Sequence, residues 1–258
     1  MTQRPVALIT GAARGIGRTI ALTFADNNYD IAMLDISFDG YKDFPDDQNK
    51  DVRDELTARG CTVESAEAST TDTIAMTDLV SRAVRRWGRI DAVICNAGGG
   101  SGPLEGNRAS DIDLAALTDV LQRNLYGTIT TVTATLPALT ASPHPSIVTM
   151  SSLNGVEPTD NGRYAHYGIA KAAVAHYTRY LARDLSDRGI RANCIAPGVI
   201  ETGRLLQRME ESPGANAALA QSLGSFGTAR DVAELALYLA SPISRYVNGQ
   251  VIRIDGGI

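Results

Sequence analysis

Short apolar runs recur along the chain, and segments long enough for a helix lie between them. Seven runs have the composition of buried β-strands: PVALIT (5–10), YDIAML (29–34), CTVESA (61–66), DAVIC (91–95), SIVTM (146–150), RANCI (191–195) and QVIRI (250–254). Apolar residues at helical spacing fill gaps such as 15–28, 73–86 and 164–187. Continuously apolar strands are covered on both faces, and their alternation with helices requires a mainly parallel sheet with right-handed crossovers. The sequence therefore predicts a doubly wound α/β fold.

The 258 residues are enough for one large α/β domain or two small ones. The sequence has no internal repeat and no long linker rich in Pro, Gly or Ser, so residues 1–258 are interpreted as a single domain. Two segments interrupt the alternation. Residues 37–49 are expected to form a surface excursion, and residues 201–227 a mobile flap on the substrate side, because Ser212-Pro213-Gly214 breaks a helical pattern there.

Charge and hydropathy exclude several classes of partner. The net charge is −5 and no basic block is present, so neither a nucleic acid nor an anionic membrane surface is expected as a partner. No apolar run approaches the roughly 18 residues that cross a bilayer, and the apolar stretch near the N-terminus is too short for that of a signal peptide. The three cysteines stand singly in apolar stretches, which indicates reduced thiols. The three histidines share no ligand spacing, so no metal site is expected. Because no signal peptide is recognised, a cytoplasmic location is expected.

A glycine-rich turn follows the first predicted strand and opens the first predicted helix. Gly11, Gly15 and Gly17 are the residues that such a turn needs if its backbone is to approach a pyrophosphate and present N–H groups at a helix N-terminus. Glycine turns also follow strands for purely structural reasons, but the position after the first strand favours a dinucleotide site.

Two residues bear on which dinucleotide binds. Asp35 ends the second predicted strand, eighteen residues after Gly17, where a carboxylate can accept hydrogen bonds from the adenine ribose hydroxyls and repel a 2′-phosphate. Arg14, inside the turn, could instead pair with a 2′-phosphate. The balance favours NAD over NADP.

Tyr167 and Lys171 are four residues apart in a predicted helix, so they share one helix face. A free tyrosine has a pKa near 10, and lowering it to neutrality requires about 4 kcal/mol of preferential phenolate stabilisation. A nearby ammonium, together with the positive charge of an oxidised nicotinamide, can supply this. The pair therefore predicts proton chemistry.

These motifs and several others resemble the classical short-chain dehydrogenase/reductase family. They run in the family's order from residue 10 to 257: TGAARGIG at 10–17, Cys95-Asn96-Ala97-Gly98, Asn124 in RNLYG, Ser152, Tyr167 with Lys171, Pro197-Gly198 with Thr202, and NGQVIRIDGG at 248–257. The resemblance implies a Rossmann fold with a seven-stranded parallel sheet flanked by helices. It also implies a homotetramer or a dimer.

The resemblance implies roles for the catalytic candidates. Tyr167 would exchange a proton with the substrate oxygen, and Lys171 would hold the nicotinamide ribose and lower the Tyr167 pKa. Asn124 would anchor a water that links Lys171 to solvent. Ser152 would hydrogen-bond the substrate oxygen, and it is favoured over Ser151 because adjacent strand residues point to opposite faces.

The remaining matches imply cofactor contacts. The family's cofactor-binding positions correspond here to Gly11, Arg14, Gly15, Ile16, Gly17, Asp35, Asn96, Ala97, Gly98, Tyr167, Lys171, Pro197, Gly198, Val199 and Thr202. His166 adjoins Tyr167 but lies about 100° around the helix from it, so it is expected at the pocket rim.

The sequence thus predicts an NAD-dependent oxidoreductase that interconverts a secondary alcohol and its ketone. A sugar, polyol or cyclic alcohol is slightly favoured, because the predicted pocket rim is polar and GGGSG spans 98–102. The alternatives are an NADPH-dependent ketoreductase of the 3-oxoacyl-carrier-protein type and, from another class, a non-catalytic NAD-binding sensor. Against the sensor, Ser152, Tyr167 and Lys171 are all present.

Overall fold

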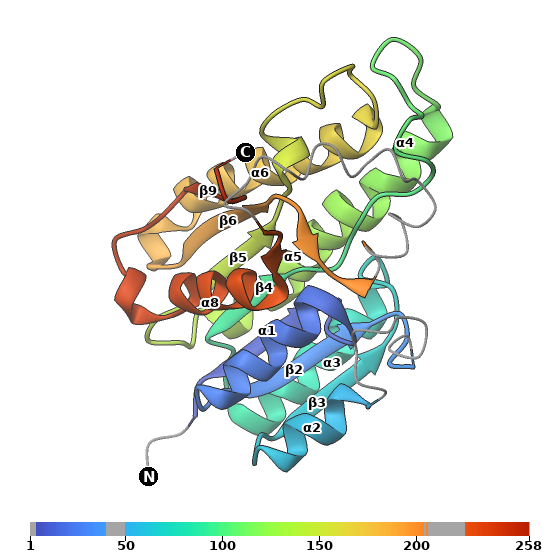
Figure 1. Ribbon diagram of the computed structural model, residues 1–258. Helices are drawn as coiled ribbons and strands as arrows, with labels where there is room; N and C mark the ends of the chain where they lie inside the picture. Colours follow the sequence, from blue (N-terminus) through green and yellow to red (C-terminus); the bar gives the residue numbers. More distant parts are fainter. Residues whose placement is uncertain (1–3, 40–49, 204, 206–224, 258) are drawn as a thin grey trace.

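A seven-stranded parallel sheet forms the centre of the molecule (Figure 1), with strand order β3-β2-β1-β4-β5-β6-β9. The computed structural model describes residues 4–39, 50–203, 205 and 225–257. The strands of this sheet are β1 (Val6–Thr10), β2 (Asp30–Asp35), β3 (Val63–Glu67), β4 (Ala92–Cys95), β5 (Ser146–Met150), β6 (Arg191–Pro197) and β9 (Val251–Ile254). All six pairings between them are parallel, which confirms the predicted doubly wound fold.

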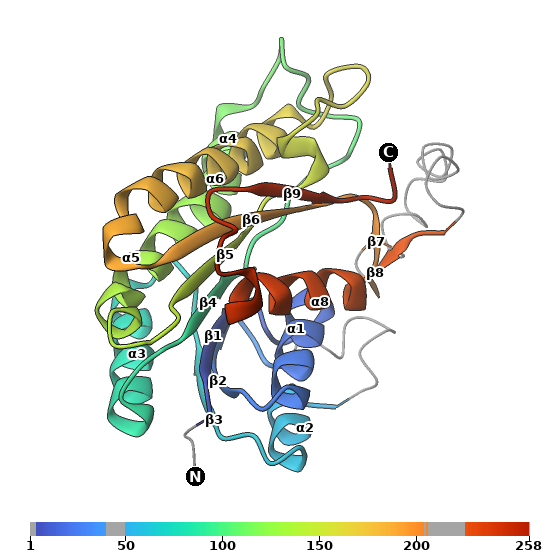
Figure 2. The same cartoon turned by 90° about the vertical axis from the view of Figure 1, so that its left-hand side faces the viewer.

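The helices cover both faces of the sheet in two layers (Figure 2). One layer holds α1 (Gly15–Asp26), α2 (Val52–Ala58) and α8 (Ala229–Ala240), and the other holds α3 (Thr73–Trp87), α4 (Leu114–Leu121), α5 (Gly127–Leu139) and α6 (Ala165–Asp184). Strand side chains alternate between the two cores, as Ala7 and Ile9 face the first layer and Val6 and Leu8 the second. This alternation follows from the two-residue period of a strand.

Short irregular elements complete the chain. The π-helix η2 (Gln122–Tyr126) joins α4 to α5, and the 3₁₀ turns are η3 (Leu153–Gly155), η4 (Ser186–Arg188) and η6 (Pro242–Ser244). Two short strands, β7 (Ile200–Glu201) and β8 (Gly227–Thr228), pair in parallel at the two ends of the predicted flap. Most of that flap, 204 and 206–224, and most of the predicted excursion, 40–49, lie outside the described residues.

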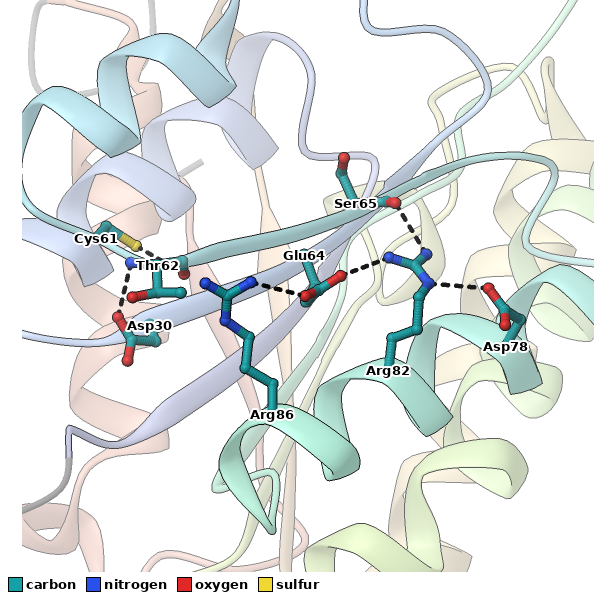
Figure 3. Close-up of polar contacts among 8 residues, drawn as sticks. All are labelled: Asp30, Cys61, Thr62, Glu64, Ser65, Asp78, Arg82 and Arg86. Atoms are coloured by element: carbon teal, nitrogen blue, oxygen red, sulfur yellow. Dashed lines mark hydrogen bonds and ion pairs between the residues drawn. The ribbon is translucent and has the colours of Figure 1, made fainter.

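The edge strand β3 is tied to α3 by charged side chains (Figure 3). Glu64 on β3 accepts hydrogen bonds from Arg82 at 2.6 Å and Arg86 at 3.0 Å, and Arg82 also donates to the Ser65 carbonyl at 2.9 Å. Just before β3 begins, the Thr62 N–H donates to the carboxylate of Asp30 on β2 at 2.8 Å. These contacts join the half-buried strand β3 at the edge of the sheet to α3 and to β2.

The structure bears on two further predictions from composition. The three cysteines are buried free thiols, as expected, and burial raises the pKa of Cys61 to about 11 and of Cys95 to about 12. Among the helices in the described parts of the chain, none has the length and apolar character to cross a membrane.

Candidate active site

The glycine turn between β1 and α1 permits contacts that a side chain would prevent. Gly11 has φ +66°, and a Cβ on Gly17 would lie 1.9 Å from the Gly11 carbonyl oxygen. The chain therefore turns within residues 11–14 and α1 begins at Gly15, and the first turn of this helix holds no acidic side chain. A helix N-terminus of this kind suits an anion, because its N–H groups and dipole favour negative charge.

The segment after β4 is joined to this turn. Asn96 Nδ2 donates to the carbonyl oxygens of Thr10 at 3.2 Å and Gly11 at 3.0 Å, and the Ala97 N–H donates to Thr10 Oγ1 at 3.1 Å. Since the strand order reverses between β1 and β4, these residues lie at the topological switch point, where doubly wound folds bind ligands. The structure thus brings together the predicted residues Gly11, Asn96 and Ala97.

Asp35 lies at the carboxyl end of β2, beside the same turn. Its carboxylate accepts the backbone N–H of Ala13 at 2.8 Å and of Ile36 at 2.7 Å. Burial raises the pKa of Asp35, and the hydrogen bonds together with the charge of Arg14 offset only part of this rise. The carboxylate is placed to receive further donors from a ligand on the turn.

Lys171 is buried in α6, with its side chain running beneath Tyr167. The Lys171 ammonium lies 5.8 Å from the centre of the Tyr167 ring and donates to the Met150 carbonyl at 2.8 Å. Burial lowers the pKa of Lys171 to about 8, with the Cys194 thiol opposing this change. The carbonyl at the end of β5 therefore holds the ammonium in place next to the phenol.

The two serines after β5 have different environments. Ser151 is buried and its hydroxyl donates to the Lys171 carbonyl at 2.8 Å. Ser152 is half-buried and its hydroxyl oxygen accepts the Asn154 N–H at 3.3 Å at the start of η3. A Cβ on Gly155 would lie 2.7 Å from the Lys171 carbonyl carbon, so this glycine allows η3 to pack closely on α6.

Asn124 lies in the π-helix η2 and is almost fully buried. Its amide oxygen accepts the Gly99 N–H at 2.9 Å, and its amide nitrogen donates to the carbonyls of Val120 at 2.7 Å and Gly99 at 3.0 Å. A Cβ on Gly98 would lie 2.4 Å from the Asn124 amide oxygen and 3.3 Å from Lys171 Nζ. The structure therefore brings Asn124 and Gly98 close to the Lys171 ammonium. The sequence pattern gave no sign of the π-helix that orients Asn124.

The segment after β6 reaches back toward the glycine turn. The Gly198 N–H donates to the Ile254 carbonyl at 3.0 Å, and Val199 accepts from the Gly227 N–H at 3.1 Å. The Thr202 methyl group lies 3.8 Å from where a Cβ on Gly15 would stand. Pro197 is the last residue of β6 and Ile16 packs against the core beneath the turn. The structure thus places both groups of predicted cofactor residues at the carboxyl ends of the central strands.

One prediction near the site is wrong. His166 was expected at the pocket rim, but its side chain is fully buried, and its Nε2 lies 3.1 Å from the Ser101 carbonyl oxygen. The neighbouring Tyr164, which sequence reasoning did not single out, is also buried and contacts the rings of His166 and Tyr167. Helical spacing alone could not reveal this, because the covering segment comes from 98–109, far away in sequence.

Taken together, a glycine turn, a strand-end carboxylate and a tyrosine above a buried lysine can hold a dinucleotide and exchange a proton with a substrate. A family model described as Enoyl-(Acyl carrier protein) reductase matches residues 11–258. The chain belongs to the short-chain dehydrogenase/reductase family. It is an oxidoreductase of a family that uses NAD(P).

Individual relatives span nearly the whole chain. It is 43% identical over 257 residues to the cyclohexanol dehydrogenase of Rhodococcus sp. (strain TK6), covering 98% of this chain and 95% of the relative. The 3-oxoacyl-[acyl-carrier-protein] reductase of Thermotoga maritima is 35% identical over 253 residues, covering 98% and 97%. The crystal structure of a 3-oxoacyl-[acyl-carrier protein] reductase with bound NAD from Brucella melitensis is similar with a TM-score of 0.82 and 26% identity, covering 100% and 92%.

The glycine turn fits the family's cofactor. Gly17 lets the turn pack closely on itself. In the part of the chain that the structure describes, only the Thr202 methyl group lies within 4 Å of where a Cβ on Gly15 would stand, so the start of α1 leaves room for a pyrophosphate. Gly98 is exposed, and its missing side chain lets the backbone after β4 lie against Asn124 and Lys171. The residues present therefore suit a dinucleotide bound across the switch point.

Proposed function

We propose that the protein is an NAD-dependent dehydrogenase that interconverts a cyclic secondary alcohol and its ketone. The observation that carries the proposal is Lys171, a buried ammonium held 5.8 Å from the centre of the Tyr167 ring. The cyclic alcohol is suggested by the name of the Rhodococcus relative, which is 43% identical to this chain. The sequence analysis favoured a sugar, a polyol or a cyclic alcohol, and the proposal selects the last of these.

In the proposed mechanism, Tyr167 is the general base for oxidation. Its phenolate oxygen accepts the proton of the alcohol and becomes a phenol, and in the reverse step the phenol returns this proton to the ketone oxygen. A nicotinamide cofactor bound at the switch point would supply the hydride chemistry, as hydride acceptor in oxidation and hydride donor in reduction. Lys171 favours the phenolate, because an ammonium close to an ionisable phenol stabilises the charged form. Burial around Lys171 strengthens this attraction by excluding water.

The neighbouring residues orient the substrate and move the proton. Ser152 hydrogen-bonds the substrate oxygen and aligns it with Tyr167, whereas the Ser151 hydroxyl is occupied by the Lys171 carbonyl. Asn124 supports a proton path between Lys171 and solvent. Gly11, Arg14, Gly15, Ile16 and Gly17 would hold the pyrophosphate of the cofactor, and Pro197, Gly198, Val199 and Thr202 would hold its nicotinamide end.

The preference for NAD rests on Asp35. Its carboxylate lies against the glycine turn through the Ala13 N–H, where it would accept the ribose hydroxyls and repel a 2′-phosphate. Arg14 acts in the opposite direction. The alternative function, an NADPH-dependent ketoreductase, is kept because the Thermotoga relative is named as a 3-oxoacyl-[acyl-carrier-protein] reductase.

Turnover of cyclohexanol tests the reaction. Nicotinamide absorbance is followed with NAD⁺ and cyclohexanol for the wild type, Tyr167→Phe and the control Tyr180→Phe, an exposed tyrosine on the same helix. We expect Tyr167→Phe to lose about 10³-fold in kcat, in line with the loss of a general base, and to bind NADH as before. Equal activity of the wild type and Tyr167→Phe would contradict the mechanism. NADH binding with no turnover on any alcohol or carrier-bound ketone would favour the sensor.

Cofactor choice is tested separately. We expect the wild type to prefer NAD⁺ at least about tenfold over NADP⁺, and Asp35→Ser to reduce this ratio at least about tenfold by removing the repulsion of a 2′-phosphate. Asp26→Asn, an exposed carboxylate paired with Arg59 on the same side of the sheet, is the control. A wild type that prefers NADP⁺ with a carrier-bound ketone would establish the alternative.

The proposal includes assembly into a homotetramer or a dimer, as the family resemblance implies. Large apolar side chains are exposed on the helices and near β9, among them Leu114, Tyr126, Ile169, Tyr180, Ile243 and Tyr246. Light scattering coupled to size exclusion measures the mass directly, and the mass of a single chain would contradict this part of the proposal.

A further inference from the structure

The loop Gly98–Gly102, which follows β4, rests on the first turn of α6 immediately before Tyr167. Ser101 provides two of its attachments: its hydroxyl donates to Asp119 of α4 at 3.2 Å, and its carbonyl oxygen lies 3.1 Å from His166 Nε2. Gly99 is held by Asn124 as described above. The loop therefore forms a wall beside Tyr167, and side chains rather than a sheet keep it there.

His166 is committed to this loop. Since a carbonyl oxygen only accepts, the Nε2 atom that faces Ser101 carries a proton and donates it in this hydrogen bond. The ring is fully buried, and among the described residues Nδ1 has no hydrogen-bond partner. The Ser101 carbonyl is thus the one polar contact described for this ring, and it joins the loop to the residue next to Tyr167.

Tyr164 fills the space between the loop and Tyr167. A Cβ on Gly100 would lie 2.0 Å from the Tyr164 hydroxyl oxygen, so the loop backbone lies directly against this side chain. The Tyr164 ring is 5.3 Å from that of Tyr167 and meets the His166 ring edge-on at 4.8 Å. A shift of the loop would therefore be transmitted to the catalytic ring through Tyr164.

The backbone of Tyr164 is strained, which indicates that its position is required. Its φ is +56°, a left-handed conformation that is unfavourable for a bulky aromatic residue. Backbone hydrogen bonds across the two segments oppose the strain: Tyr164 N–H to the Gly106 carbonyl at 2.9 Å, Ala165 N–H to Asn107 at 3.0 Å, and Ala109 N–H to Gly162 at 2.8 Å. The two segments are joined along their length, and the strained residue lies where they meet Tyr167.

We propose that His166 and Tyr164 are positioning residues that clamp the loop 98–102 against α6 and so determine which alcohols fit beside Tyr167. The inference rests on the proposed dehydrogenase function, because it concerns that reaction's substrate wall. His166 and Tyr164 contact Ser101 and Gly100, which follow the cofactor segment Asn96–Gly98. Loss of the clamp therefore weakens selection of the alcohol and leaves dinucleotide binding intact. The KM for the alcohol rises and that for the cofactor does not.

The decisive variants differ in whether they can donate to the Ser101 carbonyl. The amide nitrogen of Gln reaches about as far as His Nε2, whereas Asn is too short and Leu has no donor. His176→Leu, an exposed histidine on the same helix, is the control. We expect His166→Leu and His166→Asn to raise the cyclohexanol KM about tenfold with the NAD⁺ KM unchanged, and His166→Gln to restore it to within about threefold.

Amide hydrogen exchange of the peptide 96–104 tests the clamp without any substrate. Exchange should increase about tenfold in His166→Leu and His166→Asn, and remain at the wild-type rate in His166→Gln and His176→Leu. Equal exchange in all variants overturns the clamp, and so does a uniform increase across the protein. If His166→Leu does not fold, the pair Asn and Gln decides the question. Failure of cyclohexanol as a substrate, with the exchange pattern as expected, overturns the proposed function and leaves the clamp supported.

Discussion

The glycine turn at 11–17 and the substrate wall at 98–102 follow the carboxyl ends of the neighbouring strands β1 and β4, and they are held by different means. The turn at 11–17 is a local structure in which glycines and backbone atoms touch one another, as with Gly17 against the Gly11 carbonyl. The substrate wall, the loop 98–102, is held by residues distant in sequence, through side chains such as His166 and through backbone hydrogen bonds between 106–109 and 162–165.

The difference suggests how one fold can keep its cofactor while its substrate changes. Any side chain at Gly17 collides with the backbone, so few sequences can form the turn. The wall depends on a few side-chain contacts, each of which can be replaced by another pair of the right size. Loops held on a rigid scaffold are where specificity diverges. Variants on the two sides should therefore fail in different ways.

Gly17→Ala should have the largest effect. Its methyl group would lie 1.9 Å from the Gly11 carbonyl oxygen and 2.5 Å from Asn96 Nδ2, so the turn must open. We expect NADH affinity to fall about 1000-fold, since both the turn and its link to β4 are displaced. Titration of NADH fluorescence measures this. Gly60→Ala is the control, because Gly60 has φ +70° but open space around it, and it should lose only about 1 kcal/mol of stability. Equal NADH binding by the two variants would contradict the steric account.

Lys171→Met tests whether the ammonium of Lys171, which lies between the cofactor residues and the substrate wall, is buried. Burial lowers the Lys171 pKa from 10.5 to about 8, so the unfolded chain holds this proton more tightly than the folded one. The free energy of unfolding of the wild type should therefore rise between pH 8 and 10.5, by on the order of 3 kcal/mol relative to Lys171→Met. Below pH 8 the difference between the two proteins should be constant. Urea unfolding of both proteins without cofactor, from pH 7 to about 10.5, measures it, and parallel curves would show that the ammonium is not buried.

The sequence could predict the turn and the fold because their signals are local. Apolar runs and glycine spacing located both ends of all seven strands to within two residues. The four-residue spacing predicted that Lys171 and Tyr167 share a helix face, and the Lys171 ammonium lies 5.8 Å from the centre of the Tyr167 ring. The π-helix that aims Asn124 depends on a backbone adjustment that no residue pattern announces. The burial of His166 depends on a segment some sixty residues earlier, so the same helix face that looked like a rim is covered.

Gly100→Ala probes the wall as Gly17→Ala probes the turn. Its methyl group would lie 2.0 Å from the Tyr164 hydroxyl oxygen, but a side chain can move where a backbone carbonyl cannot. We expect the KM for the alcohol to rise about tenfold with NADH affinity unchanged. Gly102→Ala in the same loop is the matched control, because Gly102 has φ +72° and nothing within 4 Å. If both variants raise the KM equally, backbone strain in the loop, and not its contact with Tyr164, determines the result.

The edge strand β3 should respond least, although its Glu64 forms ion pairs with both Arg82 and Arg86. Burial raises the pKa of Glu64, but hydrogen bonds from Arg86 and Arg82 outweigh it and the pKa is lowered overall. The stabilisation is therefore present above the usual pKa of 4.5 and is lost as the pH falls through the folded-state value. Glu64→Gln should cost about 0.5–1 kcal/mol at pH 7, less at high salt, because partly exposed ion pairs are screened.

Thermal unfolding of Glu64→Gln at low and high salt gives this value, and Asp78→Asn is the control. Asp78 binds the same Arg82 but is far more exposed than Glu64, so its loss should change stability very little. Neither variant should alter NADH affinity, because β3 is the edge strand and the glycine turn joins β1 to α1. A fall in NADH affinity in Glu64→Gln alone would mean that the turn depends on packing across β2 and β3, and the contrast between a self-contained turn and an assembled wall would then fail.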